Sequence, residues 1–176
     1  MTFTIKKNTT GVMIIRILLV VLIIVNLSFI WINSAKTSSD STKDSKAIAK
    51  TVTEKVVKDY HELPKTEQNK EVSKMNTKIR SMAHFTEFIP LGLLFFFLAL
   101  AIFEFRKGEL IKLLLTALIL SILLSMLSAV ADEIHQIFVK GRSFEIKDIL
   151  TDTLGAFCGC IIATIPIAGF KNKILK

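Results

Sequence analysis

The chain has 176 residues, of which 51% are hydrophobic and 22% are charged, and its formal net charge is +8. Hydrophobic and charged residues are segregated along the chain, which excludes a soluble globular protein, a disordered chain and a disulfide scaffold. A membrane β-barrel would show alternating polar and apolar positions instead of long apolar blocks. The basic residues are not interleaved with aromatic residues as they are at nucleic-acid interfaces, so we expect a lipid bilayer, and no nucleic acid, as the partner.

Four blocks without a charged residue predict four transmembrane helices, and they cover residues 17–35, 88–103, 113–131 and 153–170. Each block is close to the ~20 apolar residues that cross a bilayer as a helix. The first block follows basic residues, as a signal peptide does. Its length and its poor cleavage site favour an uncleaved signal anchor. The predicted fold class is therefore an all-α membrane protein.

A polar insertion, residues 36–80, separates the first two predicted spans, and we expect it to be partly helical and extracytoplasmic. It contains 11 Lys and Arg and 7 Asp and Glu but no Phe or Trp, so it cannot bury enough apolar area to form its own core. Apolar residues recur from Ile48 to Tyr60 every four positions, which predicts a helix that ends at Pro64. A second short stripe lies between Val72 and Ile79. The expected organisation is a tail and first span at 1–35, the insertion at 36–80, a three-helix core at 81–170 with a polar loop at 132–147, and a basic tail at 171–176.

The distribution of basic residues gives a divided answer about orientation. With both termini in the cytoplasm, the cytoplasmic segments hold 9 Lys and Arg, whereas the other side holds 3 in the last loop and 11 in the insertion. A long segment with nearly balanced charge is easily translocated, so we give the short segments more weight. The expected orientation is N-in and C-in.

Polar residues gather at one predicted membrane face, whichever way the chain is inserted. In a four-span chain, the start of the second span, the end of the third and the start of the fourth share a face. Helical spacing puts His84 and Glu87 on one side of their helix, and Asp132, His135 and Gln136 on one side of theirs. The candidate binding residues are Arg80, His84, Glu87, Asp132, Glu133, Gln136, Arg142, Asp148 and Asp152.

The last span carries the clearest packing pattern. Asp148 and Asp152 are four residues apart, and the same stripe continues into Gly155 and Gly159. Small residues at this spacing let another helix approach closely, so we expect the carboxylates to point into the bundle. A lipid-facing acid would cost about 2.5–3.5 kcal/mol at the bilayer centre, and for Glu87 we expect an arginine or histidine partner.

Three interpretations of this polar cluster remain open. It is a structural network that holds helix ends together, a binding pocket for a charged lipid or glycan head group, or a catalytic site. In the catalytic case, the acid/base candidates are His84, Glu87, Asp132 and His135. No cofactor is predicted; a divalent cation held by nitrogen and oxygen ligands stays an alternative, although the spacing matches no established metal motif.

Three sequence blocks point to a known family. The first runs from Arg80 through His84-Phe to Glu87. The second begins Asp132-Glu-Ile-His-Gln and ends in Gly-Arg at Arg142, and the third reads Asp148-Ile-Leu-Thr-Asp-Thr-Leu-Gly155. In this order the blocks resemble the VanZ-like family of small integral membrane proteins, and the resemblance covers about residues 78–170.

The resemblance implies a multi-pass protein of the bacterial cytoplasmic membrane. The family is named for a protein that gives low-level resistance to teicoplanin-type glycopeptides. On this basis we expect the chain to bind the head group of an envelope lipid or peptidoglycan intermediate and to lower susceptibility to such antibiotics, with Arg80 and Arg142 contacting phosphate. The alternative is a membrane-embedded enzyme, with or without a metal, that acts on a lipid-linked envelope substrate.

Overall fold

The structure is a computed structural model that describes residues 9–103 and 110–174, with side chains as far as 166. Within these ranges every regular element is helical, which confirms the all-α fold class. The elements are α1 (Thr10–Ser34), α2 (Ser38–Val56), the 3-10 helix η1 (Tyr60–Glu62), α3 (Lys65–Ile102), α4 (Leu110–Gln136) and α5 (Ile146–Ile174). Four of them, α1, α3, α4 and α5 as far as Pro166, are long and apolar enough to cross a membrane.

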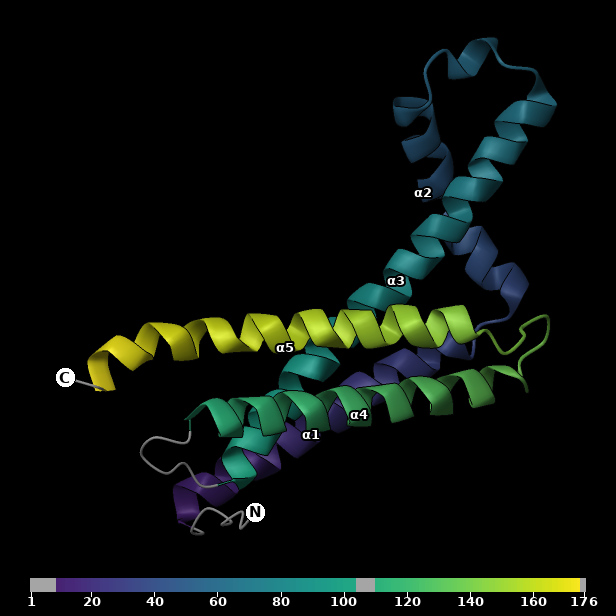
Figure 1. Cartoon of the computed structure of the whole chain (residues 1–176). Helices are drawn as coiled ribbons and strands as arrows, with labels where there is room; N and C mark the ends of the chain where they lie inside the picture. Colours follow the sequence, from purple (N-terminus) through teal and green to yellow (C-terminus); the bar gives the residue numbers. More distant parts are fainter. Residues whose placement is uncertain (1–8, 104–109, 175–176) are drawn as a thin grey trace.

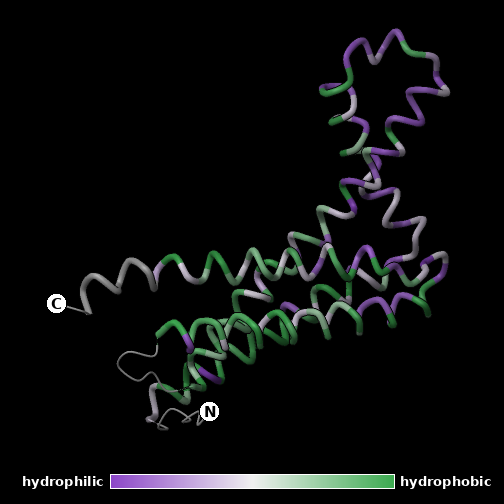
Figure 2. Tube along the Cα trace, in the orientation of Figure 1, coloured by the Kyte–Doolittle hydropathy of each residue, from purple (hydrophilic) through white to green (hydrophobic). Residues whose placement is uncertain are grey.

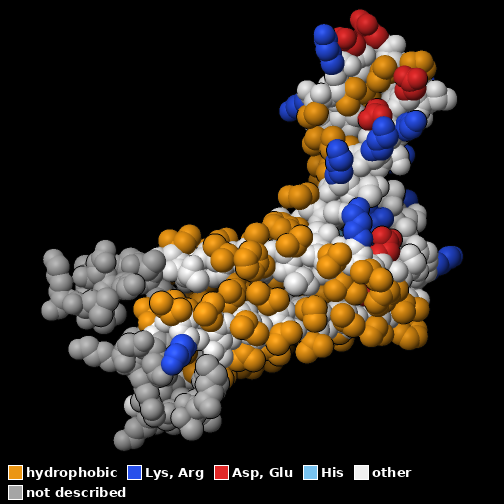
Figure 3. Space-filling view, viewed as in Figure 1, with side chains coloured by type: hydrophobic (Ala, Val, Ile, Leu, Met, Phe, Trp, Pro, Cys, Tyr) orange, Lys and Arg blue, Asp and Glu red, His pale blue; other side chains and the backbone are white. Residues whose placement is uncertain are grey.

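The helices form a bundle with an arm at one end. Figure 1 shows α1, α4, α5 and the second half of α3 running alongside one another, while α2, η1 and the first half of α3 project away from them. We call residues 38–79 the arm. The start of α1 and the end of α5 lie at the opposite end of the bundle from the arm. Hydrophobic residues dominate the bundle and hydrophilic residues the arm (Figure 2), and on the face shown in Figure 3 the charged side chains are concentrated over the arm.

Helix α3 is one continuous helix through both regions, which differs from the predicted boundary between insertion and core at residue 80. The expected helix end at Pro64 is also wrong, because α2 ends at Val56 and Pro64 is instead the N-cap of α3. A proline is tolerated where a helix begins, since no backbone N–H is needed there. The apolar stripe from Val72 onward packs against Ala49 of α2 and Tyr60 of η1, so the arm has a small apolar contact of its own.

Two further boundaries bear on the site. Helix α4 continues to Gln136, so the first five residues of the predicted loop 132–147 belong to the end of this helix. The segment that connects α4 to α5 is therefore 137–145. Its Lys140 carbonyl accepts a hydrogen bond from the Ser38 amide at 3.3 Å, which ties this connection to the start of the arm.

Glycines bring α3 and α5 together. A Cβ atom at Gly155 would overlap the Phe85 carbonyl of α3, and one at Gly159 would overlap the carbonyl of Ile89. On the opposite side of the contact, a Cβ at Gly92 would overlap the backbone of Ala156. The two backbones can approach this closely only without those side chains. The contact fixes the start of α5 against the middle of α3.

Candidate functional site

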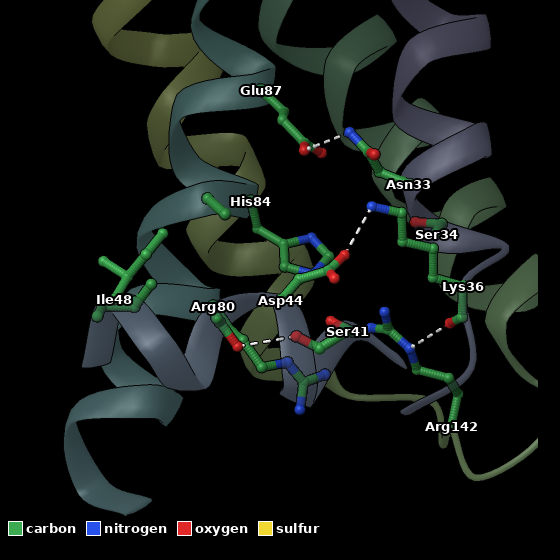
Figure 4. A pocket seen from close by; sticks show the side chains of 13 residues that line it. Asn33, Ser34, Lys36, Ser41, Asp44, Ile48, Arg80, His84, Glu87 and Arg142 are labelled. Carbon is green, nitrogen blue, oxygen red and sulfur yellow. Dashed lines mark hydrogen bonds and ion pairs between the residues drawn. The ribbon is translucent and has the colours of Figure 1, made fainter. Parts of the chain in front are cut away.

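A polar pocket of about 230 Å³ lies where the arm meets the bundle (Figure 4). The end of α1, the start of α2, the middle of α3 and the 137–145 connection all contribute to its walls. We call it the arm pocket. It is lined by Asn33, Ser34, Lys36, Ser41, Asp44, Ser45, Ile48, Ile79, Arg80, Ala83, His84, Glu87 and Arg142.

Three basic side chains line the arm pocket, and two of them lack a carboxylate partner. Lys36 Nζ is 2.9 Å from Asp44 Oδ2, so its charge is matched. Arg142 donates from Nε to the Lys36 carbonyl at 3.3 Å and from Nη1 to Gln136 Oε1 at 3.1 Å, and both acceptors are uncharged. Among the described residues, no carboxylate lies within 4.0 Å of the guanidinium of Arg80 or Arg142.

The pKa of Arg142 is lowered by its surroundings in the pocket. Burial, and then the positive charge of the neighbouring Arg80, lower the pKa of Arg142 from its usual value. Carboxylates nearby, Asp132 first among them, act in the opposite direction without reaching ion-pair distance. Two guanidinium groups that face the same cavity and repel each other form a site that an anion would stabilise.

A buried carboxylate network supports the pocket from the end of α4. Asp132 and Glu133 have no exposed surface, and Gln136 is 2% exposed. Gln136 Nε2 donates to Asp132 Oδ2 and to Glu133 Oε1, both at 2.8 Å. The hydroxyl of Ser34 donates to Asp132 Oδ2 at 2.6 Å, and the amide of Glu145 donates to Glu133 Oε2 at 2.7 Å. Because Gln136 also accepts from Arg142, the network holds that guanidinium in place.

His84, which lines the pocket, and Asp152, which does not, form a second buried pair. His84 Nδ1 lies 3.6 Å from Asp152 Oδ1. Asp152 is fully buried, and neither of its carboxylate oxygens has a hydrogen-bond partner among the described residues. The close contact between α3 and α5 at Gly155 explains this proximity, since Gly155 lies one turn after Asp152. Asp148, one turn earlier, is half-buried in the first turn of α5.

Two predicted site residues have other neighbours than expected. Glu87 lines the pocket, but its partner is an amide and not an arginine or histidine: Asn33 Nδ2 donates to Glu87 Oε1 at 2.9 Å. His135 is absent from the pocket lining, because its ring stacks on Trp31 of α1 with centroids 5.5 Å apart and planes within 6°. The four acid/base candidates therefore do not converge on one point.

Sequence reasoning missed the contribution of α1 and α2. Asn33 and Ser34 bond directly to the predicted carboxylates Glu87 and Asp132, and Lys36 and Asp44 form one wall of the pocket. The signal for α1 was present, since its end lies at the same membrane face as the other polar residues. For α2 there was no such signal, because nothing in its own sequence shows that it folds back over α3.

The described residues contain no group of three or more His, Cys, Asp and Glu side chains placed to hold a metal ion. Asp132 engages Ser34 and Gln136, whereas Asp152 faces His84. Asp132 and Asp152, two of the carboxylates that could supply oxygen ligands, thus have different neighbours. The divalent cation stays a prediction without a ligand group to support it.

Comparison with known proteins identifies the family. The family model VanZ/LLP1 matches residues 12–167, which extends the resemblance beyond the three sequence blocks to α1 and the arm. No curated protein and no solved structure matches the chain. Since the match covers most of the chain and four of its helices are apolar enough to cross a membrane, the chain is a multi-pass membrane protein of the VanZ/LLP1 family.

Proposed function

We propose that the arm pocket binds the phosphate of an envelope lipid or a lipid-linked peptidoglycan intermediate at the outer face of the bacterial cytoplasmic membrane. Bound in this way, the lipid is less accessible to teicoplanin-type glycopeptides, and susceptibility to them falls. The observation that carries the proposal is the pair of guanidinium groups, Arg80 and Arg142, that face one cavity without a carboxylate partner among the described residues. A guanidinium binds phosphate through a two-pronged hydrogen-bonded fork.

The position of the pocket along α3 supports a head group as the ligand. A helix rises ~1.5 Å per residue, and the hydrocarbon core of a bilayer is ~30 Å thick. A stretch of α3 that spans this thickness and ends at Ile102 therefore begins at about residue 83. Arg80, Ala83 and His84 line the pocket at this level, which supports a phosphate group at the membrane surface as the ligand.

Arg80 is the better residue for a binding test. Arg142 is hydrogen-bonded to Gln136 and Lys36, so its removal would disturb the site itself. No hydrogen bond or ion pair within the described residues depends on Arg80. Lys78→Ala is the matched control, because it removes one positive charge two residues earlier on the same helix, from an exposed side chain outside the pocket.

The assay is binding of phosphatidylglycerol to the purified protein by native mass spectrometry, with zwitterionic phosphatidylcholine for comparison. Hydrogen bonds to charged groups contribute about 1.5–3 kcal/mol, and 1.4 kcal/mol is a factor of ten. We therefore expect Arg80→Ala to weaken phosphatidylglycerol binding about tenfold or more, and Lys78→Ala to leave it near the wild-type value. Equal binding by the two variants would refute the proposal.

The antibiotic part of the proposal needs a cellular test. Cells that produce equal amounts of the wild-type, Arg80→Ala and Lys78→Ala proteins are compared for teicoplanin susceptibility. We expect Arg80→Ala cells to be as susceptible as cells without the protein, and Lys78→Ala cells to retain the wild-type level. If phosphatidylglycerol binding depends on Arg80 but susceptibility does not, the pocket binds lipid without a role in resistance.

The proposed orientation, N-in and C-in, places the arm outside the cell. Lys58 is exposed in the segment between α2 and η1. A cysteine at this position, Lys58→Cys, should react with a membrane-impermeant maleimide in intact cells. The wild-type chain, whose Cys158 and Cys160 are half-buried and buried in α5, measures the background. Labelling only after the cells are broken would reverse the orientation.

The His84–Asp152 pair favours one alternative, a membrane-embedded enzyme that acts on a lipid-linked envelope substrate. A carboxylate beside an imidazole nitrogen orients the ring and stabilises its protonated form, as a general base requires. His84 lines the pocket and has this partner at 3.6 Å. Turnover of a phosphate-bearing envelope lipid that is lost in His84→Gln, while the same lipid still binds, would support the enzyme over the binding protein.

A further inference from the structure

An apolar groove lies in the membrane-spanning part of the bundle, on the same two helices, α1 and α3, that line the arm pocket. It lies beside α1, has a volume of about 550 Å³, and is open along one side. Its walls come from α1, α3 and one residue of α5. The lining residues are Leu22, Val25, Asn26, Phe29, Ile89, Pro90, Leu93, Leu94 and Ile162.

Helical spacing shows that the groove and the arm pocket share the same helix faces. On α1, Asn33 lines the pocket, and Phe29, Asn26 and Leu22 line the groove, at four, seven and eleven residues before it. These separations keep side chains on one face of a helix.

Helix α3 shows the same spacing in the other direction. Ala83 and Glu87 line the pocket, and Pro90 and Leu94 follow in the groove, at seven and eleven residues after Ala83. The α1 and α3 stripes thus run side by side from the polar cavity into the apolar one. Asn33 and Glu87, joined by their hydrogen bond of 2.9 Å, mark the junction between the two.

The arm pocket and the groove together span about one leaflet of a bilayer. Asn33 in the pocket lies eleven residues from Leu22 at the end of the groove, which is roughly 16 Å at the α-helical rise, and the groove itself runs seven residues on α1 from Phe29 to Leu22, which is roughly 10 Å. Half of the hydrocarbon core is about 15 Å. A hydrocarbon chain attached to a head group in the arm pocket can therefore follow the groove for about two thirds of the depth of one leaflet.

A second groove on the other side of α1 gives a useful contrast. It has a volume of about 460 Å³ between α1 and α4, and Leu127 and Trp31 are among its lining residues. Trp31 is stacked on His135 at its pocket-side end. None of the basic residues of the arm pocket lines it. This groove therefore has an apolar surface similar to the first, and it differs in having the Trp31–His135 stack between it and the pocket residue Ser34, three residues after Trp31 on the same face of α1.

We propose that the groove between α1 and α3 holds a hydrocarbon chain of the same lipid whose phosphate occupies the arm pocket. This inference rests on the proposed function and adds the class of ligand: an anionic amphiphile recognised through both its head group and its chain. A water-soluble phosphate ester binds only the pocket and therefore binds more weakly. A chain that follows α1 also explains why a helix with few buried residues is part of the site.

Two positions allow a matched test, because Val25 in the first groove and Leu127 in the second are each 60% exposed. Val25→Trp fills the groove between α1 and α3, and Leu127→Trp fills the groove between α1 and α4. The probes are dipalmitoyl phosphatidylglycerol and its deacylated head group, glycerophosphoglycerol, and binding to the purified full chain is measured by native mass spectrometry.

We expect Val25→Trp to weaken binding of dipalmitoyl phosphatidylglycerol about tenfold relative to Leu127→Trp, while glycerophosphoglycerol binds both variants equally. Equal binding of the lipid by both variants would overturn the inference. Should binding of both probes be insensitive to Arg80→Ala, the proposed function fails instead, so the two failures are distinguishable.

Leu22→Trp tests the groove at a second position, in case Val25→Trp does not fold correctly. Leu22 lies at the far end of the groove, so a larger side chain there shortens the groove without touching the pocket. We expect weaker binding of dipalmitoyl phosphatidylglycerol and unchanged binding of the dioctanoyl lipid, whose chains are shorter. An equal loss for both lipids, or no loss for either, would count against the groove as the chain site.

Discussion

Gln136 is the side chain whose replacement should most weaken the candidate site. Its amide donates to Asp132 and Glu133 at 2.8 Å each, and its carbonyl accepts from Arg142 at 3.1 Å. Gln136→Met has a similar volume and removes these three hydrogen bonds and the longer one from Gln136 Nε2 to Ser34 Oγ at 3.5 Å. It leaves Asp132 with the Ser34 hydroxyl and Glu133 with the backbone amide at 145.

The expected cost follows from these partners. Hydrogen bonds to charged groups contribute about 1.5–3 kcal/mol each, but both carboxylates keep one donor, so the loss is smaller than three full contributions. We expect a decrease of about 3–5 kcal/mol in the free energy of unfolding, which is the range for breaking a buried charged network. For a chain of this size 1 kcal/mol corresponds to about 2–4 °C, so the melting temperature should fall by about 10 °C.

The assay is thermal unfolding of the purified protein in detergent micelles, with Gln68→Met as the control. Gln68 is 7% exposed in the arm, where its amide donates to the Leu63 carbonyl at 2.8 Å and its carbonyl accepts from the exposed Lys65 Nζ at 3.2 Å. The substitution leaves no buried charge without a partner, since the Leu63 carbonyl is uncharged and Lys65 is exposed to solvent, so it should cost only about 0.5–1.5 kcal/mol. A melting temperature for Gln136→Met that is equal to or higher than that of Gln68→Met would refute the role assigned to the network.

Three further substitutions test the packing and the polar contacts by the same assay. Gly155→Ala should lower the melting temperature by several degrees, because the added Cβ would overlap the α3 backbone and overpacking costs about 1–3 kcal/mol. Gly11→Ala is the control and should not lower the melting temperature, because a Cβ at Gly11 would have nothing within 4 Å. Asn26→Leu should raise the melting temperature, since the buried Oδ1 has no hydrogen-bond partner among the described residues and burying such an atom costs about 1–3 kcal/mol. A lower melting temperature would show that this oxygen has a hydrogen-bond partner. Ser34→Ala removes the hydrogen bond to Asp132 and should lower the free energy of unfolding by about 1–2 kcal/mol. An unchanged melting temperature would contradict this.

The spans and their order could be predicted from the sequence because a bilayer requires long uncharged helices. The prediction that polar residues share one face followed from the number of crossings alone. Side-by-side packing is harder to predict, because a helix that is apolar on all sides does not indicate which side meets a neighbour. Only the α5 stripe through Gly155 and Gly159 gave such information, and both glycines do lie against α3.

The remaining differences concern contacts between segments far apart in the chain. Lys36 and Asp44 enter the pocket because α2 folds back on α3, and His135 is turned toward Trp31 because α1 lies next to α4. Neither contact between helices can be predicted from the local periodicity of the segments concerned. The role of Pro64 was misassigned for a related reason: a proline between two helices marks a boundary, but its position alone does not say which helix it belongs to.

The continuity of α3 has a mechanical consequence. This helix of 38 residues is about 57 Å long at the α-helical rise, nearly twice the ~30 Å thickness of a hydrocarbon core. Arg80, Ala83, His84 and Glu87 lie near its middle and line the arm pocket. Because the arm and this wall of the pocket belong to one unbroken helix, a sideways displacement of the arm would also move that wall.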